Sequence, residues 1–197
     1  AALECTGVPV TRAGITEPRI DLDLARDYLL APPNVTKSFT FTAAGQLAQW
    51  TPFAGSWAFA SAGTGTYNAA PGTGSWKLST TPNCNENVTI TSKLARVWAN
   101  GQRANAGIVF KTQLSTTNKT MHGYMAAINR DLPGDNHSQN VVLWRFDGVN
   151  MVTGAGNGTL LCSANLDTIT SNTYYTLKVV SAGGVHKVYL NNALQCT

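Results

Sequence analysis

The segment from Trp50 to Phe110 places the strongest constraint on what this chain can fold into. Its apolar residues come in short alternating runs, among them W-T-P-F-A-G-S-W, G-S-W-K-L-S, N-V-T-I-T-S-K-L and A-G-I-V-F, separated by clusters of Gly, Pro and Asn. Alternation with a period of two places every second side chain on one face of a strand, and the clusters supply tight turns. We therefore expect antiparallel strands with no long helix between them.

The same pattern continues to the end of the chain and predicts most of its strands. They are expected at 88–98, 106–111, 121–130, 141–146, 174–180, 185–190 and 193–197. Turns are expected at Asn100-Gly101, Asp147-Gly148 and Gly183-Gly184, because these dipeptides accept positive φ angles. Many brief strands of this kind fold into an all-β, two-sheet antiparallel β-sandwich.

Residues 1–37 differ from the rest and predict a separate N-terminal extension, with the sandwich domain at 38–197. Acidic residues at 21–27 could begin a short helix over 21–30, and Pro32-Pro33 would end it. Ile20, Leu22 and Leu24 also alternate, so an edge strand is the competing interpretation of this segment.

Composition excludes several classes of function. Only 12% of the residues are charged, while 43% are hydrophobic, which argues against intrinsic disorder. The net charge is +4, but the lysines occur singly along the sequence, so we expect no nucleic-acid surface. No apolar run has the length of a membrane span, so we expect no membrane insertion.

The cysteines and the glycosylation sequons predict a secreted, extracellular or cell-surface protein. Cys5, Cys84, Cys162 and Cys196 form no C-x-x-C pair, and two disulfides explain an even count at wide spacing. Sequence allows three pairings, and we favour Cys5–Cys84 with Cys162–Cys196. N-x-S/T sequons occur at Asn34, Asn87, Asn118, Asn136 and Asn157.

The order of these motifs resembles a known group of modules. The segments G-S-W, A-G-I-V-F-K, L-W-R-F-D-G, Y-Y-T-L-K-V-V and H-K-V-Y-L-N-N, in this order, resemble the laminin-G-like and concanavalin A-like jelly rolls. The resemblance covers 38–197 and implies sugar binding, sometimes with calcium. In such modules a further strand follows the last hairpin, so the resemblance implies an open edge here. The N-terminal segment 1–37, a missing continuation of the chain or a strand from a neighbouring subunit would cover it.

The acidic residues argue against a glycoside hydrolase, which needs two carboxylates facing one sugar. No two acidic residues of the sandwich lie two positions apart on an expected strand. A polysaccharide lyase needs a base with a Tyr or Arg partner instead. His122 and Tyr124 lie two apart on one expected strand, with Arg130 further along it, and form the best catalytic candidate.

Aromatic and planar polar side chains are the groups that grip sugars, by stacking and by paired hydrogen bonds. The candidate ligand contacts are Trp98, Arg130, Asp131, Trp144, Arg145 and Asn150. The loop 131–136 offers two carboxylates and an amide, so calcium is a possible cofactor; otherwise none is expected.

These observations favour a non-catalytic, lectin-like module or subunit that binds a polysaccharide or the glycan of a glycoprotein. One alternative is an adhesive or structural subunit that self-assembles into a filament by strand complementation, through the N-terminal segment and the open edge. Another is a jelly-roll lyase that uses His122 and Tyr124.

Overall fold

The computed structural model describes residues 8–12, 15–19, 51–54, 57–59, 67–69, 78–80, 87–95, 104–115, 117–130, 140–166 and 169–197. Side chains are described at Phe53 and over 87–95, 105–115, 117–129, 141–166 and 169–197. All regular elements among the described residues are strands. No helix among them is long and apolar enough to cross a membrane.

The strands fall into two sets along the chain. The first set is short: β1 (Val8–Arg12), β2 (Ile15–Arg19), β3 (Thr51–Ala54), β4 (Trp57–Phe59), β5 (Tyr67–Ala69) and β6 (Leu78–Thr80). The second set forms the main body: β7 (Val88–Leu94), β8 (Ala104–Ser115), β9 (Thr120–Arg130), β10 (Asn140–Asn150), β11 (Asn157–Asn165), β12 (Tyr175–Ala182), β13 (Val185–Leu190) and β14 (Ala193–Cys196).

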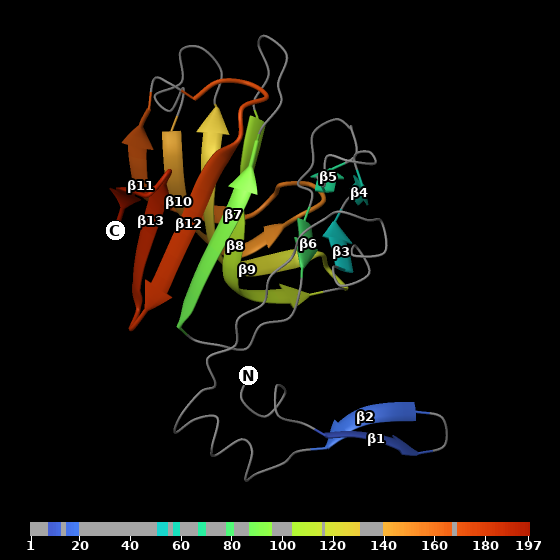
Figure 1. The fold of residues 1–197 in the computed structure, drawn as a ribbon. Coiled ribbons are helices and arrows are strands. Elements are labelled where there is room, and N and C mark those ends of the chain that lie inside the picture. Colours follow the sequence, from blue (N-terminus) through green and yellow to red (C-terminus); the bar gives the residue numbers. More distant parts are fainter. Residues whose placement is uncertain are drawn as a thin grey trace.

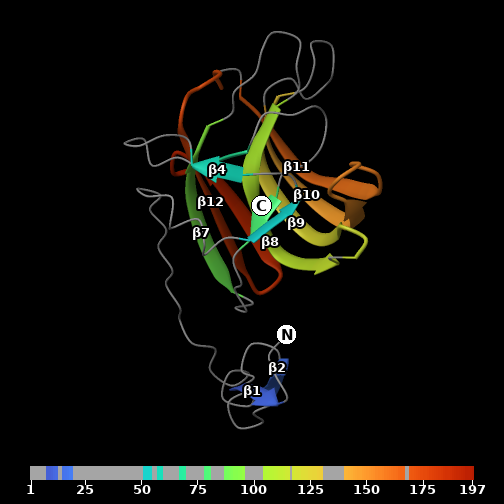
Figure 2. The ribbon, with the colours of Figure 1, turned by 90° about the vertical axis from the view of Figure 1, so that its right-hand side faces the viewer.

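The main body is a sandwich of two antiparallel four-stranded sheets. We call the sheet with strand order β14-β13-β12-β7 the front sheet and the one with order β11-β10-β9-β8 the back sheet. Figure 1 shows the front sheet nearest the viewer, and Figure 2 shows the two sheets as facing layers. The predicted all-β sandwich is confirmed.

The core between the sheets follows from alternation along each strand. In β12, for example, Leu177 and Val179 are fully buried, while Lys178 between them and Val180 after them are not. The buried residues of this core are Ile108, Phe110, Ala126, Ile128, Val141, Leu143, Ile169, Leu177, Val179, Val188, Leu190 and Cys196. Each large aliphatic side chain buried here stabilises the fold by about 1.5–3 kcal/mol.

The back sheet bends sharply toward one end because its strands are irregular there. The pairing of β8 with β9 shifts between Phe110 and Gln113, and the pairing of β10 with β9 shifts between Asp147 and Val149. Gly123 lies between these two irregularities, on β9, with a φ of 137°. Figure 1 shows β8 and β9 curving in this region. Bulges increase local twist and bend the strand that contains them.

The back sheet has a second apolar cluster on its other face. Its buried members are Phe53, Met121, Met125, Ala127, Val142, Phe146, Val149 and Met151. Phe53 comes from β3, outside the main body, and the Lys119 ammonium lies 5.2 Å from the centre of its ring. The back sheet is therefore buried on both faces over much of its length.

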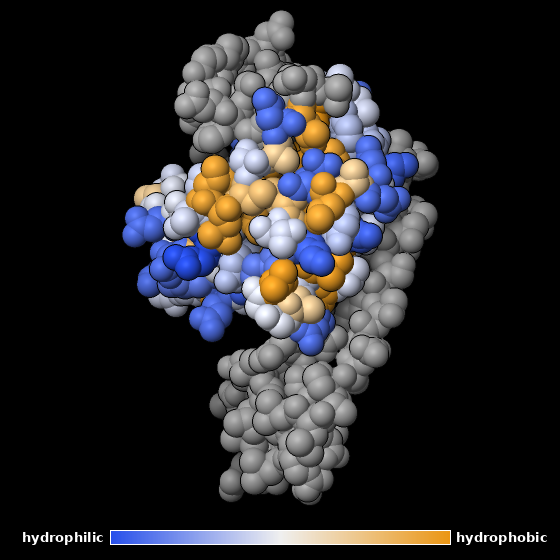
Figure 3. Space-filling view, turned by 90° about the vertical axis from the view of Figure 1, so that its left-hand side faces the viewer, coloured by the Kyte–Doolittle hydropathy of each residue, from blue (hydrophilic) through white to orange (hydrophobic). Residues whose placement is uncertain are grey.

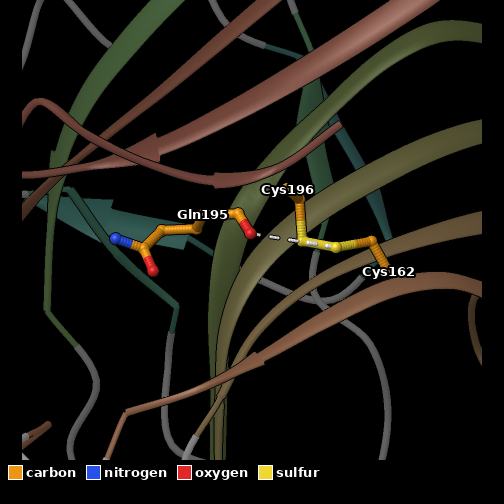
Figure 4. Close-up of a disulfide and its surroundings, with 3 residues drawn as sticks. All are labelled: Cys162, Gln195 and Cys196. Atoms are coloured by element: carbon orange, nitrogen blue, oxygen red, sulfur yellow. Dashed lines mark hydrogen bonds between the residues drawn. A yellow bond between two sulfur atoms is a disulfide. The ribbon is translucent and has the colours of Figure 1, made fainter.

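A disulfide joins the two sheets along one side of the sandwich. Cys162 on β11 is bonded to Cys196 on β14, with Cα atoms 5.8 Å apart (Figure 4). This confirms one half of the favoured pairing, and Cys5 and Cys84 lie outside the described residues. The bridge ties the end of the chain to the back sheet. Figure 3 shows this side of the molecule with apolar residues between polar ones. The two strands joined by the bridge each carry an exposed leucine, Leu161 on β11 and Leu194 on β14.

The strand expectations need two corrections. Asp147-Gly148 was expected to be a turn, but β10 runs through it, and Gly148 takes its φ of 79° within a bulge. A glycine with positive φ suits a bulge as well as a hairpin, so the dipeptide alone cannot separate the two. Strand β11 and the hairpin of β1 with β2 were not expected.

Of the remaining expectations on the fold, one is confirmed and the others fall on residues outside the described part of the chain or stay predictions. The hairpin of β12 and β13 around Gly183-Gly184 is confirmed. The expected helix over 21–30 lies outside the described residues. The division into 1–37 and 38–197 stays a prediction, as does the lending of a strand by the N-terminal segment.

Candidate functional site

Two rows of paired residues cross all four strands of the back sheet at its bend. The first row is Phe110, Tyr124, Arg145 and Thr159, and the second is Gln113, His122, Asp147 and Asn157. Directly paired residues project from the same face of a sheet, as do residues two apart on one strand. The bulge in β8 inserts one extra residue and keeps Phe110 and Gln113 on that face.

Beyond the core, this face is polar and open to solvent. We call the following residues the bend surface: Gln113, His122, Tyr124, Arg145, Asp147, Asn157 and Thr159. All of them are exposed except Tyr124, which is half-buried. The bend surface therefore combines a guanidinium, a carboxylate, an imidazole, two amides, a hydroxyl and a phenol ring within two rows.

His122 and Asp147 form the only described ion pair or hydrogen bond between side chains of this surface. Nδ1 of His122 lies 3.1 Å from Oδ1 of Asp147, and the two side chains are 52% and 72% exposed. An ionised carboxylate only accepts hydrogen bonds, so Nδ1 of His122 donates here. In the neutral imidazole Nε2 is then the acceptor and is left for a partner from solvent.

An aromatic group fixes the inner end of the bend surface. The ring of Tyr124 stacks on Phe110 with centroids 5.5 Å apart, and its centroid lies 4.3 Å from that of His186 on β13. His186 in turn makes a 2.9 Å hydrogen bond between Nδ1 and the buried Ser181 hydroxyl. Burial lowers the pKa of His186, and the nearby positive charge of Lys111 lowers that pKa further. A neutral His186 therefore packs against Tyr124 and holds its ring in place.

The arrangement suits recognition of a polar ligand better than glycoside hydrolysis. Hydrolysis by the usual route needs two carboxylates about 5 to 10 Å apart. Asp147 is the sole carboxylate among the described residues of the two four-stranded sheets. Arg145 and the amides of Gln113 and Asn157 offer hydrogen bonds to hydroxyl or carboxylate oxygens.

The structure separates two of the ligand contacts expected from the sequence. Arg145 belongs to the bend surface, whereas Trp144 points to the opposite face of β10, where it packs on the second apolar cluster. The Trp144 ring is half-buried and stacks nearly parallel to Phe146, with centroids 6.4 Å apart. The two neighbours therefore cannot contact one ligand from the same face of the sheet.

Asn150 holds the turn that follows β10. Its side-chain nitrogen donates to the carbonyl of Asn118 at 2.9 Å, and its oxygen accepts from the backbone nitrogens of Val152 and Thr153. These bonds occupy the carbonyl oxygen and one amide hydrogen. A ligand contact by Asn150 stays a prediction.

The other expected contacts cannot be placed in detail. Trp98, Asp131 and the calcium loop 131–136 lie outside the described residues, and Arg130 is described only as the backbone end of β9. Among the described residues, no group of three or more His, Cys, Asp or Glu side chains could hold a metal ion.

Sequence reasoning found part of the bend surface and missed the rest. The expected shared face of His122 and Tyr124 is what the strand pairing gives, and Arg145 was an expected contact. Gln113, Asp147, Asn157 and Thr159 were missed. The signal for Asp147 was its spacing from Leu143 and Arg145 at alternate positions, which the expected turn at Gly148 concealed.

Comparisons with known proteins support the fold. No family model matches the chain, and no curated protein matches it. A solved structure that it resembles is the carbohydrate-binding module CBM66 from Bacillus subtilis, with a TM-score of 0.56 and 19% sequence identity. The match covers 75% of this chain and 76% of that one. At this identity the likeness shows the fold, and the laminin-G-like or concanavalin A-like resemblance stays a prediction.

Proposed function

We propose that this protein is a non-catalytic glycan-binding module that works outside the cell and binds its ligand on the bend surface. The single observation that supports this most is the pair of residue rows across the back sheet. They present exposed planar polar groups beside a fixed phenol ring. The fold is also that of a carbohydrate-binding module. Sugars display hydroxyl groups around a ring with apolar C–H faces, so they need both kinds of contact.

In this proposal each part of the surface has a distinct role. Tyr124 offers the exposed part of its ring to a C–H face of the sugar, and its packing on Phe110 and His186 limits the entropy lost on binding. Arg145, paired with Tyr124 across the strands, donates to a pair of neighbouring ligand oxygens. Asp147 accepts from hydroxyl groups while it fixes the orientation of His122.

An extracellular setting is part of the proposal. The Cys162–Cys196 disulfide is stable in an oxidising compartment and is uncommon in the cytosol. Three of the predicted glycosylation sites, Asn87, Asn118 and Asn157, are exposed, and the other two lie outside the described residues. A glycan on Asn157 would cover the bend surface, so we propose that modification of this site and ligand binding exclude each other.

A glycan array followed by titration calorimetry tests the proposal. Arg145→Ala should weaken binding of the best glycan by about tenfold, as expected when a charged partner of a hydrogen bond is lost. Asn157→Ala should weaken it less, by a few-fold, as expected for a neutral hydrogen bond. Asn165→Ala is the matched control, because Asn165 is exposed on the same strand β11 but at its other end.

The outcomes are distinct. If a glycan binds the native chain and its affinity is unchanged in both Arg145→Ala and Asn157→Ala, the bend surface is not the binding site. Equal loss in the Asn165→Ala control would point to a change in the fold and not to a lost contact. No binding to any glycan would contradict the proposed function itself.

One observation favours a polysaccharide lyase as the second candidate. His122 is oriented by Asp147 with Nε2 left as the acceptor, and Tyr124 projects from the same face two positions away. A base and a phenol on one surface are what β-elimination from a uronate needs. Ultraviolet absorbance of unsaturated products, lost in His122→Gln, would establish this activity. If no such absorbance appears with a panel of uronate polymers, the lyase activity is excluded and the non-catalytic binding module remains the proposal.

A further inference from the structure

The outer face of the front sheet presents a regular grid of exposed and half-exposed side chains, and this face is turned to the viewer in Figure 1. Three rows cross this face. Strand pairing gives the rows Thr91, Lys178 and Tyr189, and Thr89, Val180 and Lys187. The remaining row is Lys93 paired with Thr176, extended by Asn191, which follows β13 and donates its backbone N–H to the Thr176 carbonyl. Each row contains one lysine, and the lysine moves one strand across from each row to the next.

The three lysines therefore form a diagonal across the face, which we call the lysine diagonal. Neighbouring strands lie about 4.8 Å apart, and successive rows are two residues apart along a strand, which is about 6.6 Å. Successive lysines, one strand and one row apart, therefore have Cα atoms about 8 Å from each other. The lysines are spread along the sequence, at positions 93, 178 and 187, which is why the sequence alone gave no sign of a cluster.

Acidic residues are absent from this sheet. The sequences of β7, β12, β13 and β14 contain neither Asp nor Glu. Within the part of the chain that the structure describes, no carboxylate pairs with Lys93, Lys178 or Lys187. The strands that present the diagonal therefore do not neutralise its positive charge, and an anion on this face is attracted by three ammonium groups.

Tyrosine rings hold two of these ammonium groups. The Lys178 ammonium lies 4.4 Å from the centre of the Tyr189 ring, and the Lys93 ammonium lies 5.7 Å from the centre of the Tyr174 ring. A cation held over a ring keeps its charge and loses some of its mobility. Threonine hydroxyls flank the diagonal, with Thr89 and Thr91 on one side and Thr176 on the other, and add hydrogen-bonding groups.

We propose that the lysine diagonal binds an acidic polysaccharide, one that bears uronate carboxylates or sulfate esters along its length. The three lysines lie in a line across three strands, so the face suits an extended chain better than a compact ligand. Repeated anions along such a chain can meet successive lysines of the diagonal. This site lies on the opposite sheet from the bend surface and does not depend on the function proposed there.

The same face fits nucleic acid poorly. Proteins that bind single strands stack bases on exposed aromatic faces. Here the Tyr189 and Tyr174 rings have a lysine ammonium over one face. Three cations without arginine also give few phosphate contacts and no bidentate ones. An acidic polysaccharide needs no such stacking, and its anions and hydroxyls match the lysines and threonines.

A pair of charge-matched double variants tests the site. Lys93→Gln/Lys187→Gln removes two charges from the diagonal, and Lys111→Gln/Lys119→Gln removes two charges from the back-sheet segments. Binding to immobilised polygalacturonate, dextran sulfate, uncharged dextran and duplex DNA is measured from about 50 to about 200 mM salt, where phosphate-type contacts weaken steeply. Arg145→Ala is measured in parallel.

The proposal expects binding to at least one of the two acidic polysaccharides and none to dextran. The diagonal double variant should bind about tenfold more weakly with a shallower salt dependence, as expected for two lost exposed charges, while the matched double stays near the native affinity. The affinity for polygalacturonate compared with the affinity for dextran sulfate shows whether carboxylate or sulfate is the preferred anion. Arg145→Ala should keep this binding, which separates it from the bend surface.

Three outcomes would overturn the proposal. They are the absence of binding to both acidic polysaccharides, an equal loss of affinity in the two double variants, and tighter binding of DNA than of either polysaccharide. Unchanged thermal unfolding of the double variants, followed by circular dichroism, checks that each loss reflects charge and not structure.

Discussion

The two sheets of the sandwich share antiparallel pairing but differ in how their faces are used, and the strands of the back sheet are the longer ones. In the front sheet, β7, β12 and β13 alternate regularly, with one buried face and one open face that presents the lysine diagonal, and a register shift occurs only where β13 pairs with β14. The back sheet is buried on both faces along much of β9 and β10, and bulges bend it where its residues become exposed. Regular alternation places every second side chain on one open face, and the bulges bring unlike side chains together at the bend.

The largest expected effect concerns the bridge between the two sheets. Replacing both Cys162 and Cys196 by Ala should lower the free energy of unfolding by about 4 kcal/mol, the loop-closure value for cysteines 34 residues apart. Denaturant unfolding measures this, with the reduced native chain as a control for lost sulfur contacts. A change below about 1 kcal/mol would mean that the sheets hold together without the bridge.

The second prediction compares the two apolar clusters directly. Leu177 lies between the sheets and Met121 lies on the other face of the back sheet, and both are fully buried. Each truncation to Ala should cost about 3 kcal/mol, within the range for large side chains removed from a packed core. If Met121→Ala costs almost nothing while Leu177→Ala costs the full amount, the back sheet has one core face and not two.

These two predictions also mark what the sequence can and cannot specify. Alternation in segments such as 175–180 identifies the strand and its buried face without further information, because one face of the front sheet is open. In β9, the run Met125, Ala126, Ala127 and Ile128 is apolar throughout. Such a run indicates burial on both faces but names neither partner, since the second cluster includes Phe53 from a distant strand.

The candidate sites were predictable only in part for a related reason. His122 and Tyr124 are neighbours on one strand, so their shared face follows from a period of two. Asp147 and Asn157 join them only through the register of three strands, and a bulge shifts that register by one residue. Pairing across strands depends on where each bulge falls, which local sequence does not determine.

The third prediction tests whether the bend depends on a single glycine. A Cβ on Gly123 would lie 2.7 Å from the carbonyl oxygen of Lys111 and 2.9 Å from Cα of Thr112, and φ there is 137°. Gly123→Ala should cost roughly 2–3 kcal/mol, since backbone strain and a clash with backbone atoms add together. Thermal unfolding measures the cost, and binding to the bend surface should weaken with it.

Gly183→Ala is the matched control for the front sheet. Gly183 also has a positive φ, at 55°, but a Cβ there meets nothing within 4 Å. That change should cost only about 1 kcal/mol, the price of a left-handed backbone. Similar costs at the two positions would show that strain alone matters and that the close approach at the bend does not.

The smallest expected effect lies where the two sheets meet at His186. Its pKa is lowered in the folded state, first by burial and then by Lys111, so the unfolded chain binds more protons at a given acidic pH. The stability linked to this group is therefore fully present above the ordinary histidine pKa of about 6.5 and decreases as the pH falls below it. Unfolding midpoints at a series of pH values should show this decrease.

Two histidine variants separate the source of this pH dependence. His186→Gln should reduce the loss of stability at acidic pH, while His122→Gln, which alters the exposed partner of Asp147, should leave that loss in place. A pH dependence that is the same in native protein and His186→Gln would mean that the contact of His186 with Ser181 and Tyr124 tolerates the charged imidazole.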